Sequence, residues 1–209
     1  IQYISQILSN TAGLNDADNR SIFSNSFTYL NAKKETAENI YDDILTKIFN
    51  TNLKGANLFV DNLKGSDGEL GLRVGNADSY FGVINVGDEK KLHGLLIENG
   101  VLGMDKDFSQ SLFKSINHKS SSINLLIGSK KFTEGWSSWR VSTMGLMNIG
   151  KGEGSQIIQL FGRGVRLKGY NLSLKRSSRL DDYQRPNEKT PSYLSTLETL
   201  NIFGIKADY

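Results

Sequence analysis

Short apolar runs alternate with segments of helical periodicity from Phe81 onward, and this alternation constrains the fold more than any other feature of the sequence. In chain order the expected strands and helices are strand 81–86, helix 88–97, helix 108–116, strand 123–127, strand 141–149 and helix 155–165. Buried strands that alternate with helices are typical of a parallel sheet covered on its faces. The sequence therefore predicts an α/β fold with a mostly parallel sheet flanked by helices.

The segment before this alternation has its own patterns. Helical spacing predicts the end of a helix over 1–12, followed by a polar loop. Thr36 can cap the next helix, whose apolar residues up to Phe49 form one continuous face with the i, i+4 pattern of a core helix. Between 57 and 75 the period changes to two on either side of Ser66-Asp67-Gly68, which predicts a β-hairpin. The hairpin can act as a strand-separating pin, form a docking surface or extend the sheet.

Composition excludes several classes of protein. The 209 residues suit one domain, or one domain with an appendage, and 38% of them are hydrophobic. The absence of cysteine excludes thiolate metal sites, cysteine nucleophiles and disulfides. Apolar runs of strand length predict no membrane span, and we expect no signal peptide. Because the chain begins at Ile1 in a helical pattern, we expect it to be part of a longer protein. A net charge of +3 supports a polyanionic partner only weakly.

The working residues of a parallel sheet lie in the loops after the strands, which directs attention to two segments. GSKKFTEGW spans 128–136, and GKGEGSQIIQLFGRGVRLKG spans 150–169. Arg163 and Arg166 are three residues apart on one side of a predicted helix, and paired guanidiniums are suited to grip phosphate. Gly162 and Gly164 each cost a helix about 1 kcal/mol relative to alanine, which close approach to a ligand or a neighbouring domain would explain. A solvated basic face is the alternative.

Other phosphate and metal motifs fail on this sequence. The glycines at 150, 152 and 154 do not give G-x-G-x-x-G, and G-x-x-x-x-G-K-[ST] occurs nowhere. His93 and His118 have no metal-ligand spacing around them, so we expect no zinc hydrolase and no metal site.

QLFGRGVR (159–166) is similar to the Q-x-x-G-R-x-x-R signature called motif VI of superfamily-two helicases, and GSKKFTEGW resembles motif V of the same domain. Together with FGVINVGD, STMGLMNIG and LETLNIFGIKADY, they make the chain resemble the motor subunit of type III restriction endonucleases from about Tyr80 to Tyr209. The resemblance implies the second RecA-like domain of an ATP-dependent helicase or translocase that acts on DNA before cleavage. One departure is Ser137, where the family commonly has Asn or Asp.

The resemblance also implies roles for individual residues. Arg163 and Arg166 would be arginine fingers that reach the γ-phosphate of ATP and stabilise the transition state. The other residues implied at the ATP site are Gln159, Gly162, Gly135 and Glu134. The residues implied to contact DNA are Ser129, Lys130, Lys131 and Gly87. ATP and Mg²⁺ would be held mainly by a first motor domain outside this sequence, which leaves the isolated chain inactive. Double-stranded DNA and a modification (methyltransferase) subunit would be the partners, in a bacterial cytoplasm.

On this basis we divide the chain into four parts. A helical lead-in covers 1–56, the hairpin insertion 57–79, the RecA-like core 80–170, and a connector toward a nuclease domain 171–209. Arg176 and Arg179 in the connector fit a solvated basic run better than a DNA contact.

Several alternatives remain open from sequence. The parent can be another superfamily-two helicase, or the domain can be a nucleic-acid-binding or docking module that does not hydrolyse ATP. Lys130 and Lys131 fit an exposed helix start as well as a DNA contact. For Trp136 and Trp139 a place in the core is favoured over stacking on bases. No recognisable motif indicates the recognition sequence or the subunit stoichiometry. None indicates whether the motor unwinds DNA, translocates along it or slides on it.

Overall fold

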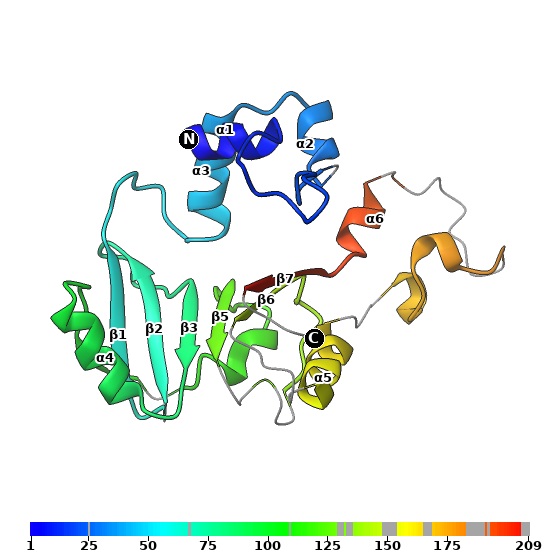
Figure 1. Ribbon diagram of the computed structural model, residues 1–209. Helices are drawn as coiled ribbons and strands as arrows, with labels where there is room; N and C mark the ends of the chain where they lie inside the picture. Colours follow the sequence, from blue (N-terminus) through cyan, green and yellow to red (C-terminus); the bar gives the residue numbers. More distant parts are fainter. Residues whose placement is uncertain are drawn as a thin grey trace. The chain divides into compact units, whose positions relative to one another are not determined.

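The computed structural model has two compact units, Ile1–Phe113 with Ser122–Ile127, and Lys114–Ser121 with Gly128–Tyr209 (Figure 1). The residues that the structure describes are 1–24, 26–66, 68–108, 110–128, 132, 136–147, 154–164, 169–182, 191 and 193–205. None of the described helices has both the length and the apolar character needed to cross a lipid bilayer.

The first unit begins with three helices, α1 (Gln2–Leu8), α2 (Thr28–Ala32) and α3 (Ala37–Lys47). The predicted cap of α3 is confirmed, because the Thr36 hydroxyl accepts the N–H of Asn39 at 3.2 Å. The expectation of a core helix is wrong, since no residue of α3 is fully buried. Its apolar stripe is half-covered, and Phe49, just beyond the helix, packs against the sheet core.

A five-stranded sheet forms the centre of the first unit, in the order β4-β1-β2-β3-β5. Its strands are β1 (Leu58–Lys64), β2 (Glu69–Val74), β3 (Gly82–Asn85), β4 (Asp105–Asp107) and β5 (Leu125–Gly128). β2 is antiparallel to both β1 and β3, while β4 runs parallel to β1. The unit is thus a mixed α/β sheet with helices.

The predicted hairpin is confirmed as β1 and β2, which pair from Leu58 opposite Val74 to Asn62 opposite Leu70. Both strands lie in the interior of the sheet order, with β4 on one side and β3 on the other. The hairpin therefore belongs to the sheet, as in the third of the three interpretations that the sequence allowed.

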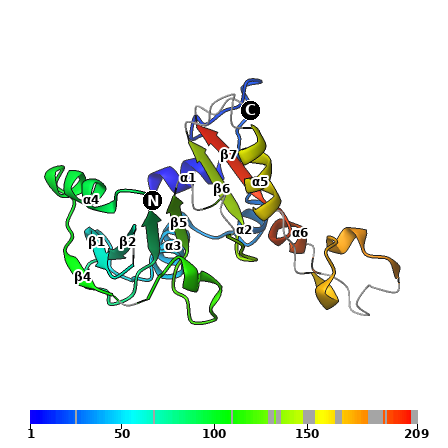
Figure 2. The ribbon, with the colours of Figure 1, turned by 90° about the horizontal axis from the view of Figure 1, so that it is seen from below.

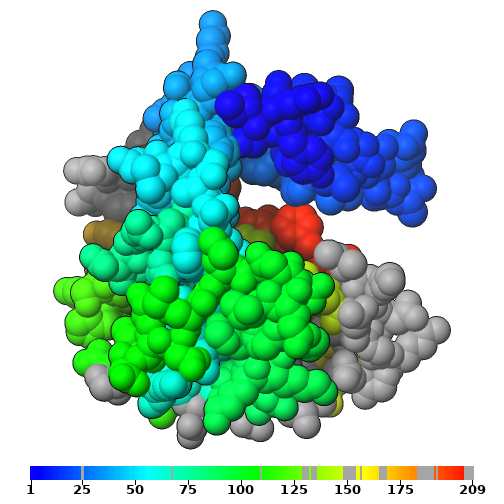
Figure 3. Space-filling view, turned by 90° about the vertical axis from the view of Figure 1, so that its left-hand side faces the viewer, coloured from blue at the N-terminus to red at the C-terminus, as the bar shows by residue number. Residues whose placement is uncertain are grey.

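One face of the sheet carries the apolar core under helix α4 (Glu89–Glu98). Val60, Leu70, Leu72 and Phe81 are buried there, and the α4 residues packed against them are Leu92 and Leu96. The expectation that Leu95 and Ile97 also point inward is wrong, because they are 47% and 41% exposed. The rest of this core is covered by Phe49, Val74, Ile84 and Val101, so α4 contributes only one i, i+4 pair. Figure 3 shows the outer surface of α4 in green.

The opposite face of the sheet carries a buried charge cluster. Asp61 of β1 is fully buried and accepts hydrogen bonds from Arg73 Nε at 2.6 Å and from the Tyr80 hydroxyl at 3.1 Å. Burial acts to raise the pKa of Asp61, but the hydrogen bond and charge of Arg73 outweigh it and hold that pKa below its usual value. Burial and the Asp61 charge together raise the pKa of Tyr80. Asp61 is therefore ionised at neutral pH, and the Tyr80 phenol is protonated.

The helix expected over 108–116 is not found. Only η1 (Lys114–Asn117), a turn of 3₁₀-helix, forms near its end. The buried Glu69 carboxylate accepts the N–H of Leu112 at 2.8 Å and the hydroxyl of Ser111. The N–H of Phe108 donates to the Lys64 carbonyl at 3.0 Å, so this part of the chain follows the sheet edge. Long-range contacts override the local helical spacing here.

The second unit is built around two parallel strands, β6 (Thr143–Met147) and β7 (Asn201–Ile205), with helix α5 (Gly154–Gly164) beside them (Figure 2). Its other elements are η4 (Tyr170–Leu172), η5 (Ser177–Arg179) and α6 (Leu194–Leu197). β7 comes from the part of the chain that we expected to be a connector, and it pairs with β6 along its whole length.

Candidate functional site

The sequence-predicted site residues divide into those the structure describes and those it does not. Arg166, Gly135, Glu134, Ser129, Lys130 and Lys131 lie outside the described residues. Gln159, Gly162 and Arg163 belong to α5 in the second unit, whereas Gly87 belongs to the first unit. The candidate site is therefore built from α5 and from the described part of the chain after the predicted motif V.

Helix α5 has a buried stripe and an exposed stripe. Ile157 is 3% exposed and Gly164 is buried, seven residues later on the same stripe. Gln159 and Gly162 are exposed, three residues apart, and Ile158 beside them is 71% exposed. Two of the residues predicted to face a nucleotide thus lie on the side of α5 that the unit's own core does not use.

The two glycines of α5 have different surroundings. A Cβ on Gly164 would lie 2.7 Å from Met144 Cε and 2.8 Å from a Leu200 methyl group, so this glycine lets α5 approach β6 and the chain before β7. A Cβ on Gly162 would meet nothing within 4 Å. The cost of a glycine in the helix is explained by internal packing at Gly164, while none of the residues that the structure describes requires a glycine at 162.

Arg163 connects the two motif-like segments. It is half-buried near the end of α5, and its guanidinium donates a hydrogen bond to the backbone carbonyl of Trp136. Trp136 is the last residue of the predicted motif V, so the structure brings the two segments together through this contact. A charged donor on a carbonyl is among the stronger protein hydrogen bonds.

Further contacts, which sequence reasoning missed, fix the chain just after Trp136. Asn117 Nδ2 donates to the Ser137 carbonyl at 2.8 Å, and the buried Ser138 hydroxyl accepts the N–H of Arg140 at 3.1 Å. Arg140 Nη1 in turn donates to the Ile116 carbonyl at 2.7 Å. These contacts anchor segment 136–140 to η1, and no periodicity in the sequence signals them. Ser137 takes part through its backbone.

The two tryptophans lie in different environments. Trp136 is half-buried, with its ring edge-on to Phe132 at a centroid distance of 5.3 Å. Trp139 is 51% exposed, so the expectation of a core position is wrong for this residue. An exposed indole leaves a ring face that a base or another aromatic group can cover.

Gly87 follows β3 in the first unit and is exposed, with nothing within 4 Å of a Cβ at that position. Its neighbour Asp88 caps α4 by accepting the N–H of Lys91 at 3.0 Å. The N–H of Val86 donates to the Gly68 carbonyl at 3.1 Å, which holds the turn of the hairpin against this loop. Gly87 therefore lies where the hairpin turn and the start of α4 meet.

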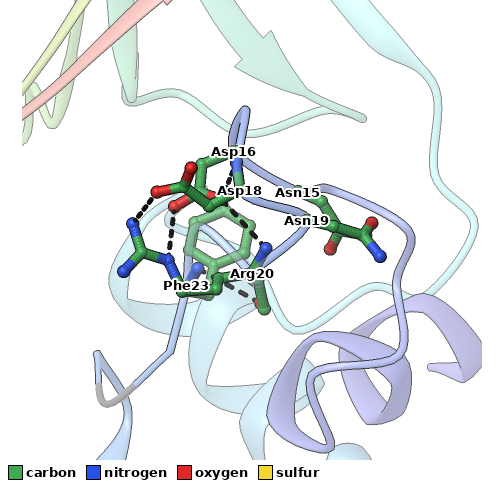
Figure 4. Close-up of polar contacts among 7 residues, drawn as sticks. Asn15, Asp16, Asp18, Asn19, Arg20 and Phe23 are labelled. Atoms are coloured by element: carbon green, nitrogen blue, oxygen red, sulfur yellow. Dashed lines mark hydrogen bonds and ion pairs between the residues drawn. The ribbon is translucent and has the colours of Figure 1, made fainter.

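The acidic side chains of the loop between α1 and α2 pair with an arginine of the same loop. Figure 4 shows Asp16 and Asp18 pointing toward Arg20, with Arg20 Nε 3.1 Å from Asp16 and Nη2 2.6 Å from Asp18. Among the described residues, no group of three or more acidic, histidine or cysteine side chains is arranged to hold a metal ion.

Part of the basic run after α5 takes part in contacts within the second unit. Lys175 Nζ pairs with Asp181 at 2.8 Å, and Glu198 accepts the N–H of Ser177 at 2.8 Å at the start of η5. Arg176 and Arg179 are exposed.

Comparisons with known proteins identify no family for the chain. No family model, no curated protein and no solved structure matches it.

Proposed function

We propose that the chain is the second RecA-like motor domain of an ATP-dependent DNA motor of the superfamily-two helicase class, of the kind found in type III restriction endonucleases. The observation that carries the proposal is the contact between Arg163 of QLFGRGVR and the Trp136 carbonyl of GSKKFTEGW. Two segments chosen from sequence for one shared ATP site are neighbours in the fold, as that function requires.

In this proposal the exposed stripe of α5 faces the nucleotide. Arg166 reaches the γ-phosphate, Arg163 holds the preceding segment in register and supports the developing charge, and Gln159 contacts the nucleotide. Gly162 leaves room for phosphate close to the helix backbone, which agrees with the open space around it. An arginine finger contributes about a thousandfold or more to turnover.

The remaining predicted residues complete the proposal. Glu134 and Gly135 would link nucleotide to DNA, and Ser129, Lys130, Lys131 and Gly87 would contact strand phosphates without reading sequence. ATP and Mg²⁺ would be bound mainly by a first motor domain. Double-stranded DNA and a modification subunit would be the partners of the parent enzyme.

A second candidate function is a nucleic-acid-binding or docking module without ATP turnover. The observation that favours it is the engagement of Arg163 itself, because a half-buried guanidinium bound to a backbone carbonyl can be wholly structural. Arg166 then separates the two candidates, since a docking module has no need of a second arginine at this spacing.

The experiment is DNA-stimulated ATP hydrolysis by the full-length parent protein with Arg166→Ala, Arg163→Ala and Arg163→Lys. We expect Arg166→Ala to lower turnover about a hundredfold or more while ATP still binds. Arg163→Lys keeps the charge but loses the planar guanidinium, and we expect a partial loss.

The matched control is Arg20→Ala, which removes an arginine that is 70% exposed and pairs with Asp16 and Asp18. Exposed ion pairs contribute about 1 kcal/mol or less, so this variant should hydrolyse ATP like the wild type. Wild-type turnover in both Arg166→Ala and Arg163→Ala would contradict the motor assignment and leave the docking module as the function.

A further inference from the structure

An exposed tryptophan lies in the turn between segment 136–138 and β6 of the second unit. Trp139 is 51% exposed. Within the described part of the chain, no aromatic ring and no side-chain cation packs on its indole, whereas Trp136 lies edge-on to Phe132. A single exposed apolar side chain is common on protein surfaces, but two further features set this one apart.

The first feature is that the turn is fixed on both sides of Trp139. On one side, Asn117 Nδ2 of η1 donates to the Ser137 carbonyl at 2.8 Å. On the other side, Arg140 Nη1 donates to the Ile116 carbonyl at 2.7 Å. The indole is therefore presented on an anchored turn, which reduces the conformational entropy that a ligand must remove when it binds.

The second feature is the charge of the chain around this turn. In the second unit, 114–121 and 128–152 carry six cations and one carboxylate, that of Glu134, which is a formal charge of +5. The six cations are Lys114, Lys119, Lys130, Lys131, Arg140 and Lys151. Because the whole chain has a net charge of +3, the rest of it carries −2. The positive charge of the molecule is thus concentrated in the sequence on either side of Trp139.

Two of these cations lie close to Trp139 within the described part of the chain. Arg140 follows Trp139 in the same turn and is exposed. Lys119 is exposed two residues after Asn117, the residue that binds the turn, and it has no ion-pair partner among the described residues. The indole therefore lies between exposed positive groups on one surface.

An exposed aromatic ring among cations suits one class of polyanion. In single-stranded nucleic acid the cations contact the phosphate backbone and the ring stacks on an unpaired base. The paired bases inside a duplex are stacked on one another, so they offer the ring no free face. We propose that this surface binds single-stranded nucleic acid, with an unpaired base stacked on Trp139 and the adjacent phosphates held by Lys119 and Arg140.

The identity of the strand as DNA rests on the proposed function, whereas the surface itself does not. In the proposed motor, a base would leave the duplex to reach Trp139, so the motor would hold its DNA locally open. Because strand binding is measured without ATP, its failure leaves the role of Arg166 in turnover untouched. Failure of the ATPase test likewise leaves strand binding untouched.

The test is a fluorescence titration of the chain with a short single-stranded oligonucleotide, at low salt and without ATP. The chain has two tryptophans, so Trp136→Phe leaves Trp139 as the only one. We expect the strand to quench this fluorescence, because a stacked base contacts the indole directly. The same strand annealed into a duplex should bind about tenfold or more weakly, since the stacking contact is lost.

Substitutions of Trp139 separate stacking from general apolar contact. Anisotropy of a fluorescein-labelled strand measures the affinity of each variant. Trp139→Leu keeps an apolar side chain without a ring and should weaken strand binding about tenfold or more, while Trp139→Phe should retain most of the affinity. Tyr170→Leu is the matched control, since Tyr170 is 52% exposed in the same unit but lies outside the basic stretch. This control should bind like the wild type.

A charge reversal tests the phosphate contacts. Lys119→Glu should weaken strand binding and reduce its salt dependence by about one phosphate contact. Arg179→Glu, at an exposed cation elsewhere in the second unit, should change neither. Absence of quenching, equal affinity for strand and duplex, or equal losses in Trp139→Leu and Tyr170→Leu would overturn the proposal. The same quenching by polyglutamate would also overturn it and would identify an acidic protein segment as the ligand.

Discussion

At the scale of single residues, the ion pair of Asp61 and Arg73 is buried within the first unit, with side chains that are 0% and 5% exposed. Asp61 also accepts the backbone N–H of Met104 at 3.1 Å, so it joins β1, β2 and the chain before β4. Buried pairs of this kind add little when intact, but each partner leaves an uncompensated charge when the other is removed.

Asp61→Asn should therefore destabilise the chain by about 3–5 kcal/mol, because Arg73 stays charged and buried without its carboxylate. Urea unfolding followed by circular dichroism measures the difference. Asp43→Asn is the matched control, since Asp43 pairs with Lys47 on the surface of α3 with both side chains more than half exposed. This control should cost about 1 kcal/mol or less, and equal effects of the two substitutions would refute the buried pair.

The same pair predicts how stability depends on pH. The pKa of Asp61 is lower in the folded chain than its usual value of about 4. Its contribution to the free energy of unfolding is thus fully present above about pH 4 and is lost as the pH falls through the lower folded pKa. We expect the difference in stability between wild type and Asp61→Asn to shrink in acid, measured by urea unfolding from neutral pH downward. A constant difference across that range would contradict this assignment.

Sequence anticipated residues whose partners are local and missed those whose partners are distant. Thr36 caps α3 through an N–H three residues away, a pattern visible in the sequence. The partnership of Asp61 with Arg73 depends on strand register, and that of Arg163 with Trp136 depends on how α5 packs. For the pair of Asp61 and Arg73, the available signal was a charged residue at an inward strand position. The contact of Arg163 with Trp136 had no signal in the sequence.

At the scale of elements, α5 offers a test in which two glycines of one helix serve as each other's control. Gly162→Ala should stabilise the second unit by up to about 1 kcal/mol, since the methyl group meets nothing and alanine favours the helix. Gly164→Ala should stabilise it less than Gly162→Ala does, because the ends of the Met144 and Leu200 side chains must shift to make room for the methyl group. Thermal unfolding of the two variants measures both effects.

In the parent protein the same Gly162→Ala variant should lose ATP turnover despite its higher stability, if phosphate approaches the helix backbone there. Unchanged turnover would remove Gly162 from the ATP site without affecting the packing argument.

Elements with strong local patterns were predictable and elements defined by their neighbours were not. The hairpin, α3, α4 and α5 formed where the sequence predicted. β4 and β7 were missed, because β4 has three charged residues at an edge and β7 carries no turn signal to identify its partner. The 108–116 segment had helical spacing, but Glu69 and the Lys64 carbonyl bind its backbone instead.

At the scale of the whole molecule, the α/β class followed from the sequence, while the division into two units did not. The chain lacks the phosphate-cradling sequence G-x-x-x-x-G-K-[ST]. In the proposed function it supplies one side of an ATP site.

The isolated chain should therefore show no DNA-stimulated ATP hydrolysis above background, while the full-length parent does. Phosphate release measured for both, at equal molar concentration and with the same DNA, checks this. Turnover by the isolated chain would require a complete active site within these residues and would contradict the proposal.

The pairing of β6 with β7 has a consequence for how a ribosome produces this protein. β6 occupies 143–147, and the strand that pairs with it is not synthesised until 201–205. Translation proceeds at roughly 5–20 residues per second, so nascent β6 spends seconds without its partner. During that interval its free edge is open to other chains, which makes this stretch a natural binding site for a chaperone on the emerging polypeptide.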